Sequence, residues 1–151
     1  MCHNRAILKD VQLAFDGSLA ELTRLAAEVQ SFCAEHSLAP EIEFDLVLAL
    51  EELFTNAVRH GGCEGMRGAI EIRLARAADG VMLDFRDRGR PFNPLAVPAP
   101  DFDIPLADRP VGGLGIHLVR EIMRDLRYER VGEWNRLSMR RPLGGGTTCS
   151  G

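Results

Sequence analysis

The chain has 151 residues and a formal net charge of −4, with 46% apolar and 26% charged residues. That length suits one domain with a real hydrophobic core, and the even spread of lysine and arginine gives no electrostatic reason to expect nucleic-acid binding. Because there is no leading apolar run and no apolar stretch of about 18 residues, we expect neither a secretory signal nor a membrane span, and we expect the protein in the cytoplasm. The four cysteines contain no C-x-x-C pair, which favours reduced thiols over a zinc site.

The first half of the chain predicts one strand and two helices. Alternating apolar residues over about 6–15 indicate an opening strand. Ser18 followed three positions later by Glu21 forms a capping box, and apolar residues at helical spacing come after it. Pro40 suits the first turn of a second helix, which we expect to end near His60, before a pair of glycines.

The second half predicts a hairpin, an irregular segment, a third helix and two more strands. Alternating residues over 70–74 and 81–85 flank Asp79-Gly80, a two-residue hairpin turn signal. Residues 88–112 contain six of the eight prolines, which excludes a helix or a central strand and is typical of a lid or binding loop. The remaining predicted elements are a helix over about 114–125 and strands near 126–131 and 135–141.

This order of elements lacks the βαβ alternation of a parallel, doubly wound sheet. It predicts an α+β two-layer sandwich, in which a mostly antiparallel mixed sheet carries about three helices on one face. We expect a single domain over residues 1–143, with a lid at 88–112 and a flexible tail at 144–151.

Within the second helix, Glu52 lies four positions before Asn56. Four residues advance a helix by about 400°, so both side chains project from one flank, about 6 Å apart along the axis. They lie beside an apolar stripe, where polar groups are costly unless something binds them. A metal–phosphate ligand would do so, although this spacing alone more often marks an ordinary exposed helix edge. The apolar stripe consists of Leu46, Leu50, Leu53 and Ala57.

Asp87 continues the buried-facing alternation of Val81, Leu83 and Phe85. Burying an ionised carboxylate is expensive unless hydrogen-bond donors meet it. Asp87 therefore either caps a turn at Arg88-Gly89 or lies at the bottom of a pocket. In a pocket, it would accept a hydrogen bond from an exocyclic amine such as that of adenine.

The segment VGGLGIHLV, residues 111–119, places three glycines just before an amphipathic helix. Glycines let the backbone approach a ligand closely, and the unpaired N–H groups of a helix start favour phosphate. The pattern is neither the dinucleotide fingerprint nor the P-loop. Alone, such a segment is often just a tight turn.

Three segments, taken in order, resemble a known set. They are similar to the N box, first Gly box and second Gly box of the ATPase superfamily that includes gyrase, MutL and histidine kinases. Within it, the sequence most resembles the small bacterial anti-sigma factors that are also serine protein kinases, from the opening strand to about Arg141. The resemblance implies a Bergerat-type ATP-binding fold. The segments are EELFTNAVRHG (51–61), DRGRPFNP (87–94) and PVGGLGIHLVREIMRDLRYER (110–130).

The resemblance also implies roles for individual residues. Asn56 would coordinate Mg²⁺ at the phosphates of ATP or ADP, and Glu52 would be the general base that takes a proton from the attacking hydroxyl. Asp87 would accept a hydrogen bond from the adenine N6 amine, with Gly89 allowing close approach of the base. The other implied cofactor-binding residues are Phe92, Arg109, Gly113, Leu114 and Gly115.

Two positions depart from the family pattern. Pro91 stands where many members have glycine, and Asn135 stands where some members have a threonine near adenine. The closing GGGTT, residues 144–148, imitates the family's final motif, but no strand length remains after it and we interpret it as tail.

The implied function is that of an ATP-dependent serine kinase and anti-sigma factor, which sequesters a sigma factor and phosphorylates a serine of a STAS-type antagonist. The alternative is a nucleotide-gated protein-binding regulator without kinase activity. The presence of Glu52 favours the kinase, because binding alone needs no base. A detached histidine-kinase catalytic domain is disfavoured, since no phospho-acceptor hairpin precedes the boxes. Whether the protein forms a homodimer stays open, and we expect no nucleic-acid or membrane partner.

Overall fold

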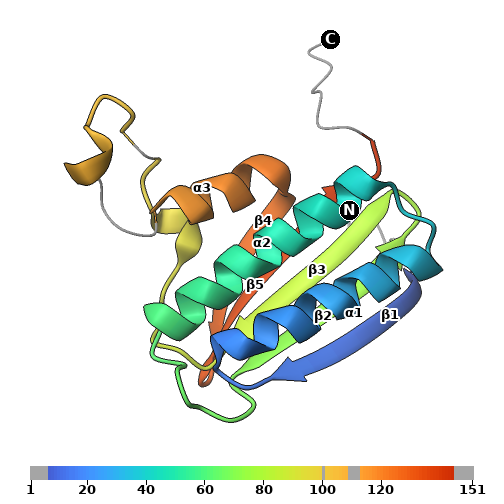
Figure 1. Ribbon diagram of the computed structural model, residues 1–151, viewed down its shortest axis with the longest axis horizontal. Coiled ribbons are helices and arrows are strands. Elements are labelled where there is room, and N and C mark those ends of the chain that lie inside the picture. The colour runs from blue at the N-terminus through green and yellow to red at the C-terminus, as the bar shows by residue number, and fades with distance from the viewer. Residues whose placement is uncertain (1–6, 100, 109–112, 145–151) are drawn as a thin grey trace.

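The computed structural model describes residues 7–99, 101–108 and 113–144. Its elements follow the predicted order (Figure 1). Within the described residues, no helix combines the length and the apolarity needed to cross a bilayer. The predicted tail lies outside the described residues except for Gly144. The elements are β1 (Ile7–Phe15), α1 (Leu22–Glu35), α2 (Pro40–Arg59), β2 (Ile70–Ala77), β3 (Gly80–Asp87), α3 (Gly113–Ile122), β4 (Arg124–Val131) and β5 (Trp134–Pro142), with 3-10 turns at Leu19–Glu21, Pro94–Ala96 and Leu106–Asp108.

The strands form one five-stranded sheet in the order β1-β2-β3-β5-β4. Every strand pair in the described part of the chain is antiparallel, and the three helices lie on one face of the sheet (Figure 1). The predicted two-layer α+β fold is confirmed. Because β5 enters between β3 and β4, Asp87 at the end of β3 lies opposite Asn135 near the start of β5.

The hydrophobic core lies between the sheet and the three helices, and α2 contributes the most residues to it. The predicted stripe of α2 is buried, with each of its four residues 6% exposed or less. Phe54 of α2 also packs edge-to-face on Phe15 of β1, with ring centroids 5.8 Å apart. Glu52 and Asn56 lie at the border of this buried face and are half-buried, as their spacing predicted.

The β2–β3 hairpin turns one residue earlier than the sequence predicted. Ala77 pairs with Gly80, so the two loop residues are Ala78 and Asp79, and Gly80 is the first residue of β3. A Cβ atom on Gly80 would lie 2.5 Å from the carbonyl oxygen of Arg141 in the neighbouring strand β5. Glycine is therefore required at position 80 because two backbones approach closely there. The sequence cannot distinguish such a glycine from one that a turn requires.

Two helix ends also differ from their predictions. The Ser18 hydroxyl accepts from the Ala20 N–H at 3.3 Å, but Glu21 reaches back to the N–H of Asp16 rather than to that of Ser18, and a 3-10 turn precedes α1. α3 ends at Ile122 rather than near residue 125 as predicted, because β4 already begins at Arg124. An irregular register at the start of β4, with Asp125 at a φ of 55°, accommodates the abrupt change from helix to strand.

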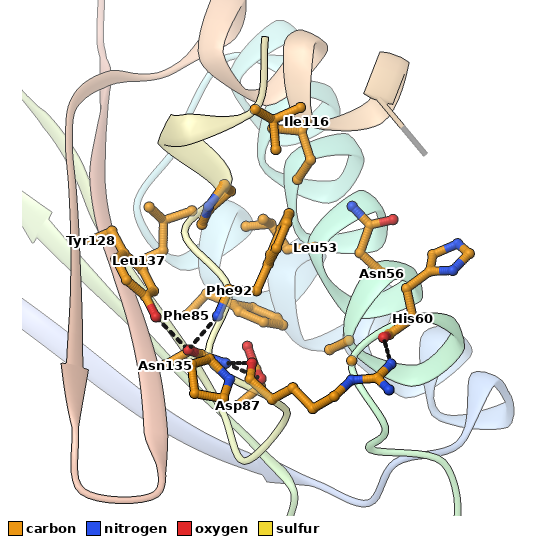
Figure 2. Close-up of a pocket in the computed structure, with 16 residues that line it drawn as sticks. Leu53, Asn56, His60, Phe85, Asp87, Phe92, Ile116, Tyr128, Asn135 and Leu137 are labelled. Carbon is orange, nitrogen blue, oxygen red and sulfur yellow. Dashed lines mark hydrogen bonds between the residues drawn. The ribbon is translucent and has the colours of Figure 1, made fainter. Parts of the chain in front are cut away.

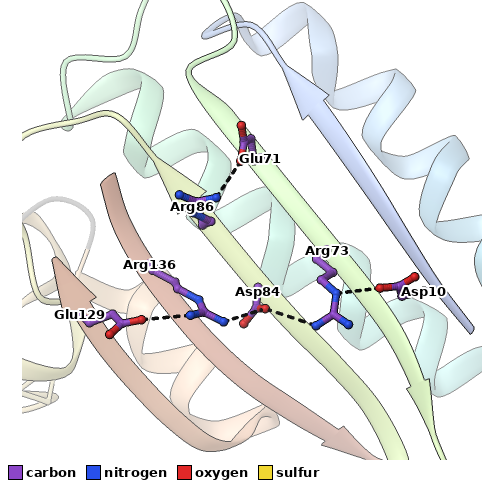
Figure 3. A network of polar contacts seen from close by, with 7 residues as sticks. All are labelled: Asp10, Glu71, Arg73, Asp84, Arg86, Glu129 and Arg136. Atoms are coloured by element: carbon purple, nitrogen blue, oxygen red, sulfur yellow. Dashed lines mark hydrogen bonds and ion pairs between the residues drawn. The ribbon is translucent and has the colours of Figure 1, made fainter. Parts of the chain in front are cut away.

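The uncovered face of the sheet carries alternating charges on neighbouring strands (Figure 3). Asp84 of β3 lies between Arg136 of β5, at 3.2 Å, and Arg73 of β2, at 3.9 Å. Ion pairs extend the row from Arg136 to Glu129 and from Arg73 to Asp10. The sheet is thus apolar on one face and polar on the other, as expected for an antiparallel sheet with one solvated face.

Candidate functional site

A cavity of about 520 Å³ opens between α2, the end of β3, the segment after β3, and α3. Of the predicted site residues, Asn56, Asp87 and Phe92 line it (Figure 2). Its volume is in the range of small-molecule sites. The complete lining is Leu53, Asn56, Ala57, His60, Gly61, Phe85, Asp87, Arg90, Pro91, Phe92, Pro94, Val97, Ile116, Tyr128, Asn135 and Leu137.

The walls of the cavity are largely apolar. They include Leu53 of α2, Phe85 of β3, Ile116 of α3 and Leu137 of β5, four residues whose chain positions follow the core-facing pattern of their elements. The sequence analysis placed Leu53 and Phe85 in core-facing rows and named neither Ile116 nor Leu137, and it could not show that these residues line a cavity. An apolar cleft with a few polar groups is the usual form of a site for a flat, mostly apolar ring.

Asp87 is the acidic group of the cavity. Its Oδ1 accepts hydrogen bonds from the Gly89 N–H at 2.8 Å and from Asn135 Nδ2 at 3.0 Å. Burial raises the pKa of the Asp87 carboxyl above its ordinary value, and the hydrogen bonds from Asn135 and Gly89 and the charge of Arg130 oppose that rise. One oxygen caps the turn, as the first sequence-based interpretation predicted, and the residue also lines the cavity.

The segment after β3 is fixed to the end of α2 through Gly89 and Arg90. The Arg90 N–H donates to the Gly61 carbonyl at 2.9 Å, and the Arg90 guanidinium donates to the His60 carbonyl. A Cβ atom on Gly89 would lie 2.7 Å from the Gly61 oxygen. The contact with Gly61, just after α2, is therefore itself a reason for glycine at position 89, besides the predicted approach of a base.

Glu52 lies beside the cavity, against α3. A Cβ atom on Gly115 would come 2.0 Å from Glu52 Oε2, so the carboxylate rests directly on the backbone of α3. Asn56, one turn further along α2, lines the cavity itself. The structure thus brings Glu52 against the third glycine of the 111–119 segment, while Asn56 faces the cavity.

Replacing Gly115 by alanine is expected to move Glu52 without unfolding the protein. The obstacle is the end of a flexible side chain, and alanine in a helix is favoured over glycine by about 1 kcal/mol. The free energy of unfolding in urea should therefore change by about 1 kcal/mol or less, while a crystal structure should show Glu52 in another rotamer. A loss of more than about 2 kcal/mol would instead mean that the α3 backbone has to yield.

Of the remaining predicted residues, Gly113 and Leu114 begin α3, and Arg109 lies outside the described residues. Sequence reasoning missed Tyr128 and Arg130 of β4. Tyr128 lines the cavity, and Arg130 Nη1 donates to the Gly89 carbonyl at 2.8 Å. The period-two alternation of β4 could have placed both side chains on the helix-covered face of the sheet. It could not have predicted that they reach the residues at the end of β3, because β5 lies between β3 and β4.

A family model described as the histidine kinase-like ATPase domain matches residues 15–141. The chain belongs to that family. The matched span contains α2, the end of β3 and α3, the elements that form the cavity. The family predicted from the three sequence motifs is therefore confirmed.

Known relatives of this ATPase domain include a kinase. A Bordetella bronchiseptica protein named serine/threonine-protein kinase BtrW is 32% identical over 98 residues, which are 65% of this chain and 69% of that protein. The crystal structure of the RsbU and RsbW domains of a Mycobacterium tuberculosis protein aligns with a TM-score of 0.65 and 17% identity. The alignment covers 89% of this chain and 32% of that longer chain, and it shows a shared fold.

The predicted lid of the ATPase domain has two parts that differ in packing. The first part, up to Val97, is anchored: Pro94 is buried, Leu95 and Val97 pack against the core, and Arg120 of α3 donates to the Val97 carbonyl at 2.7 Å. Residues 101–105 are exposed. The sequence indicated only an irregular segment here, and the structure shows that its first part is packed against the core.

Chymotrypsin is expected to cut the ATPase domain after Phe102 faster than after Phe92. Both aromatic rings are accessible, at 61% and 49% exposure. The Phe92 backbone, however, donates to Asn135 at 3.2 Å and adjoins the anchored part, so cleavage there requires the anchor to open first. Timed digestion followed by mass spectrometry gives the order of the two cuts. Equal rates would show that the first part of the lid opens as readily as the second.

Proposed function

We propose that this ATPase domain binds ATP or ADP with Mg²⁺ in the cavity beside α2. The observation that carries the proposal is the Asp87 carboxylate in an apolar cleft. In the described part of the chain, both of its hydrogen bonds end on Oδ1. Oδ2 is then the oxygen to accept the adenine N6 amine, while Leu53 and Ile116 offer apolar surface to the ring.

The residues present also fit a magnesium–phosphate group. Asn56 presents a carboxamide at the cavity, and Mg²⁺ is commonly held by one or two protein oxygens together with phosphate oxygens. A neutral ligand is adequate where phosphates bring the negative charge. The start of α3, from Gly113 to Gly115, would supply backbone N–H groups to phosphate. We propose Phe92, Leu114 and Arg109 as further contacts, and residues 88–112 as a lid of one domain spanning 1–143.

We further propose that the protein is an anti-sigma factor in the cytoplasm, which sequesters a sigma factor and phosphorylates a serine of a STAS-type antagonist. Glu52 would accept the proton of the serine hydroxyl as its oxygen bonds to the transferred phosphorus, and ADP would leave. The match to a named serine/threonine-protein kinase supports this reaction class. So does a carboxylate one helical turn from the proposed metal ligand.

The alternative is a nucleotide-gated regulator that holds its partner without transferring phosphate. One feature favours it: the Glu52 carboxylate rests against Gly115 and is not part of the cavity lining. As a kinase, the protein would need Glu52 to leave this contact, or the substrate serine to approach along the α3 side.

Replacing Asn56 by alanine is expected to remove magnesium-dependent nucleotide binding. In calorimetry, wild type should bind MgADP more tightly than metal-free ADP. Asn56→Ala should bind the two forms with equal affinity. Thr55→Ala, at the neighbouring half-buried position of α2, is the matched control and should bind like wild type. A wild-type protein that binds neither ATP nor ADP, or that binds GTP equally well, would remove the central claim.

Phosphate transfer is tested separately, by incubating the protein with labelled ATP and the STAS-type antagonist encoded nearby. Label on an antagonist serine supports the kinase. Wild-type protein that binds ATP and a sigma factor, yet labels no candidate antagonist, supports the regulator without kinase activity.

A further inference from the structure

Asn135 of β5 is a buried amide, 6% exposed, with partners on both sides of its side chain (Figure 2). Its Oδ1 accepts from the Tyr128 hydroxyl at 2.6 Å and from the Phe92 N–H at 3.2 Å. Its Nδ2 donates to Asp87 Oδ1 at 3.0 Å and to the Arg90 carbonyl at 2.8 Å. One side chain thus joins β4, the end of β3 and the start of the lid.

The chemistry of these partners permits only one orientation of the Asn135 amide. On one side lie a carboxylate and a backbone carbonyl, which can only accept and therefore need the NH₂ group. On the other side, the Phe92 N–H can only donate and needs the oxygen. The Tyr128 hydroxyl must then be a donor as well. Flipping the amide would set Oδ1 against the carboxylate of Asp87 and leave Phe92 unpaired.

The fold places this amide beside the acid through strand order. Asn135 and Asp87 are direct partners in the β3–β5 ladder, and Tyr128 is opposite Leu137 in the next ladder. Arg130, from the same strand as Tyr128, donates to the Gly89 carbonyl at 2.8 Å. β4 and β5 therefore hold Asp87 and the first turn of the lid in place through the Arg130 and Asn135 side chains.

We propose that Asn135, fixed in orientation by Tyr128, is a positioning residue that keeps Asp87 an ionised acceptor and sets the preference of the cavity for a 6-amino purine over a 6-oxo purine. This inference rests on the proposed nucleotide binding. An ionised carboxylate accepts from the adenine amine and repels the oxygen of hypoxanthine. A protonated carboxyl could donate to that oxygen, so any loss of the Asn135 donor favours the wrong base.

Burial already opposes ionisation of Asp87, and the hydrogen bond from Asn135 is the largest effect that lowers its pKa again. Other charged or titratable groups near Asp87 include Arg130 and Tyr128 of β4, Arg90 of the lid, His60 just after α2, and the Cys63 thiol. Arg130 would remain if Asn135 were replaced, but it acts through charge alone and directs neither oxygen into the cavity.

Affinities for MgADP and MgIDP, measured by calorimetry on Asn135→Leu and Tyr128→Phe, test the inference. IDP carries the 6-oxo group in place of the amine. Wild type should prefer ADP. In Asn135→Leu, the ratio of ADP to IDP affinity should fall by about 10-fold or more, the value of a hydrogen bond to a charged group. Tyr128→Phe removes one hydroxyl and should lower the ratio by about threefold. Ser138→Ala, on the opposite face of β5, should leave the ratio unchanged.

Each outcome separates this inference from the proposed function. A wild type that binds neither nucleotide overturns the nucleotide site, and the inference falls with it. A wild type that prefers ADP, with variants that lose ADP and IDP binding by equal factors, overturns the inference alone, since a merely structural role lowers both. If Asn135→Leu is too unstable to assay, Tyr128→Phe decides, and an unchanged ratio in that variant contradicts the inference.

Discussion

Glu52→Gln is expected to remove most phosphate transfer to the antagonist serine and to leave nucleotide binding intact. Glutamine keeps the length of the side chain and its contact with Gly115, but it cannot take a proton from the attacking hydroxyl. Loss of a general base typically costs about 10²–10⁴-fold in rate. Single-turnover transfer from labelled ATP gives the rate, and calorimetry with MgADP gives the affinity, which should stay within about threefold of wild type.

Glu51→Gln is the matched control for this prediction. It removes the same charge one residue earlier, about 100° around the helix and off the flank shared with Asn56. Its transfer rate should equal that of wild type. If Glu52→Gln retained wild-type transfer, Glu52 would be a helix residue without a catalytic role. If Glu52→Gln lost nucleotide binding as well, the residue would belong to the binding site.

Asp87→Asn is expected to cost about 10- to 100-fold in ADP affinity, the range of a lost charge-assisted hydrogen bond of about 1.5–3 kcal/mol. The new side chain can keep Oδ1 toward Gly89 and Asn135. Its NH₂ group then replaces Oδ2 and meets the adenine amine donor to donor. Calorimetry with MgADP measures the loss. Asp84→Asn, on the opposite face of the same strand, controls for the change in charge and should bind ADP like wild type.

The same substitution should not destabilise the protein without nucleotide. The folded-state pKa of Asp87 is raised, chiefly by burial, so the folded state holds this proton more tightly than the unfolded state does. Relative to Asp87→Asn, wild type should lose stability as the pH rises from the ordinary carboxyl range through the raised pKa, with no further change above it. Thermal unfolding across that range measures the difference. A fall in the melting temperature of Asp87→Asn at neutral pH would contradict this sign.

Local sequence patterns were enough for the elements that supply the two sides of the site. α2 begins at Pro40 and has the predicted buried stripe, because a period of 3.6 residues is a property of one segment alone. Alternation likewise predicted β2 and β3. Motif order then identified the family, since three weak signals at fixed spacing are specific together.

Glycine was harder to interpret than apolar periodicity. At Gly80, Gly89 and Gly115 a Cβ atom would meet another segment, which is backbone at the first two positions and the Glu52 side chain at the third. The sequence indicated a turn, a ligand and a phosphate loop at those positions. A missing side chain can serve a tight turn, a bound group or a close backbone, and only the neighbour in space distinguishes them.

The sequence by itself determined that this chain has an α+β fold, an ATPase family signature and a carboxylate on the buried-facing side of β3. Only the tertiary structure decided what holds that carboxylate. Asn135 and Tyr128 lie far along the chain from Asp87, and they support it because β5 enters the sheet between β3 and β4. The alternation of side chains along one strand does not show which strand will pair with it. Strand order depends on pairing between distant segments, so the partners of a buried charge are known only from the assembled sheet.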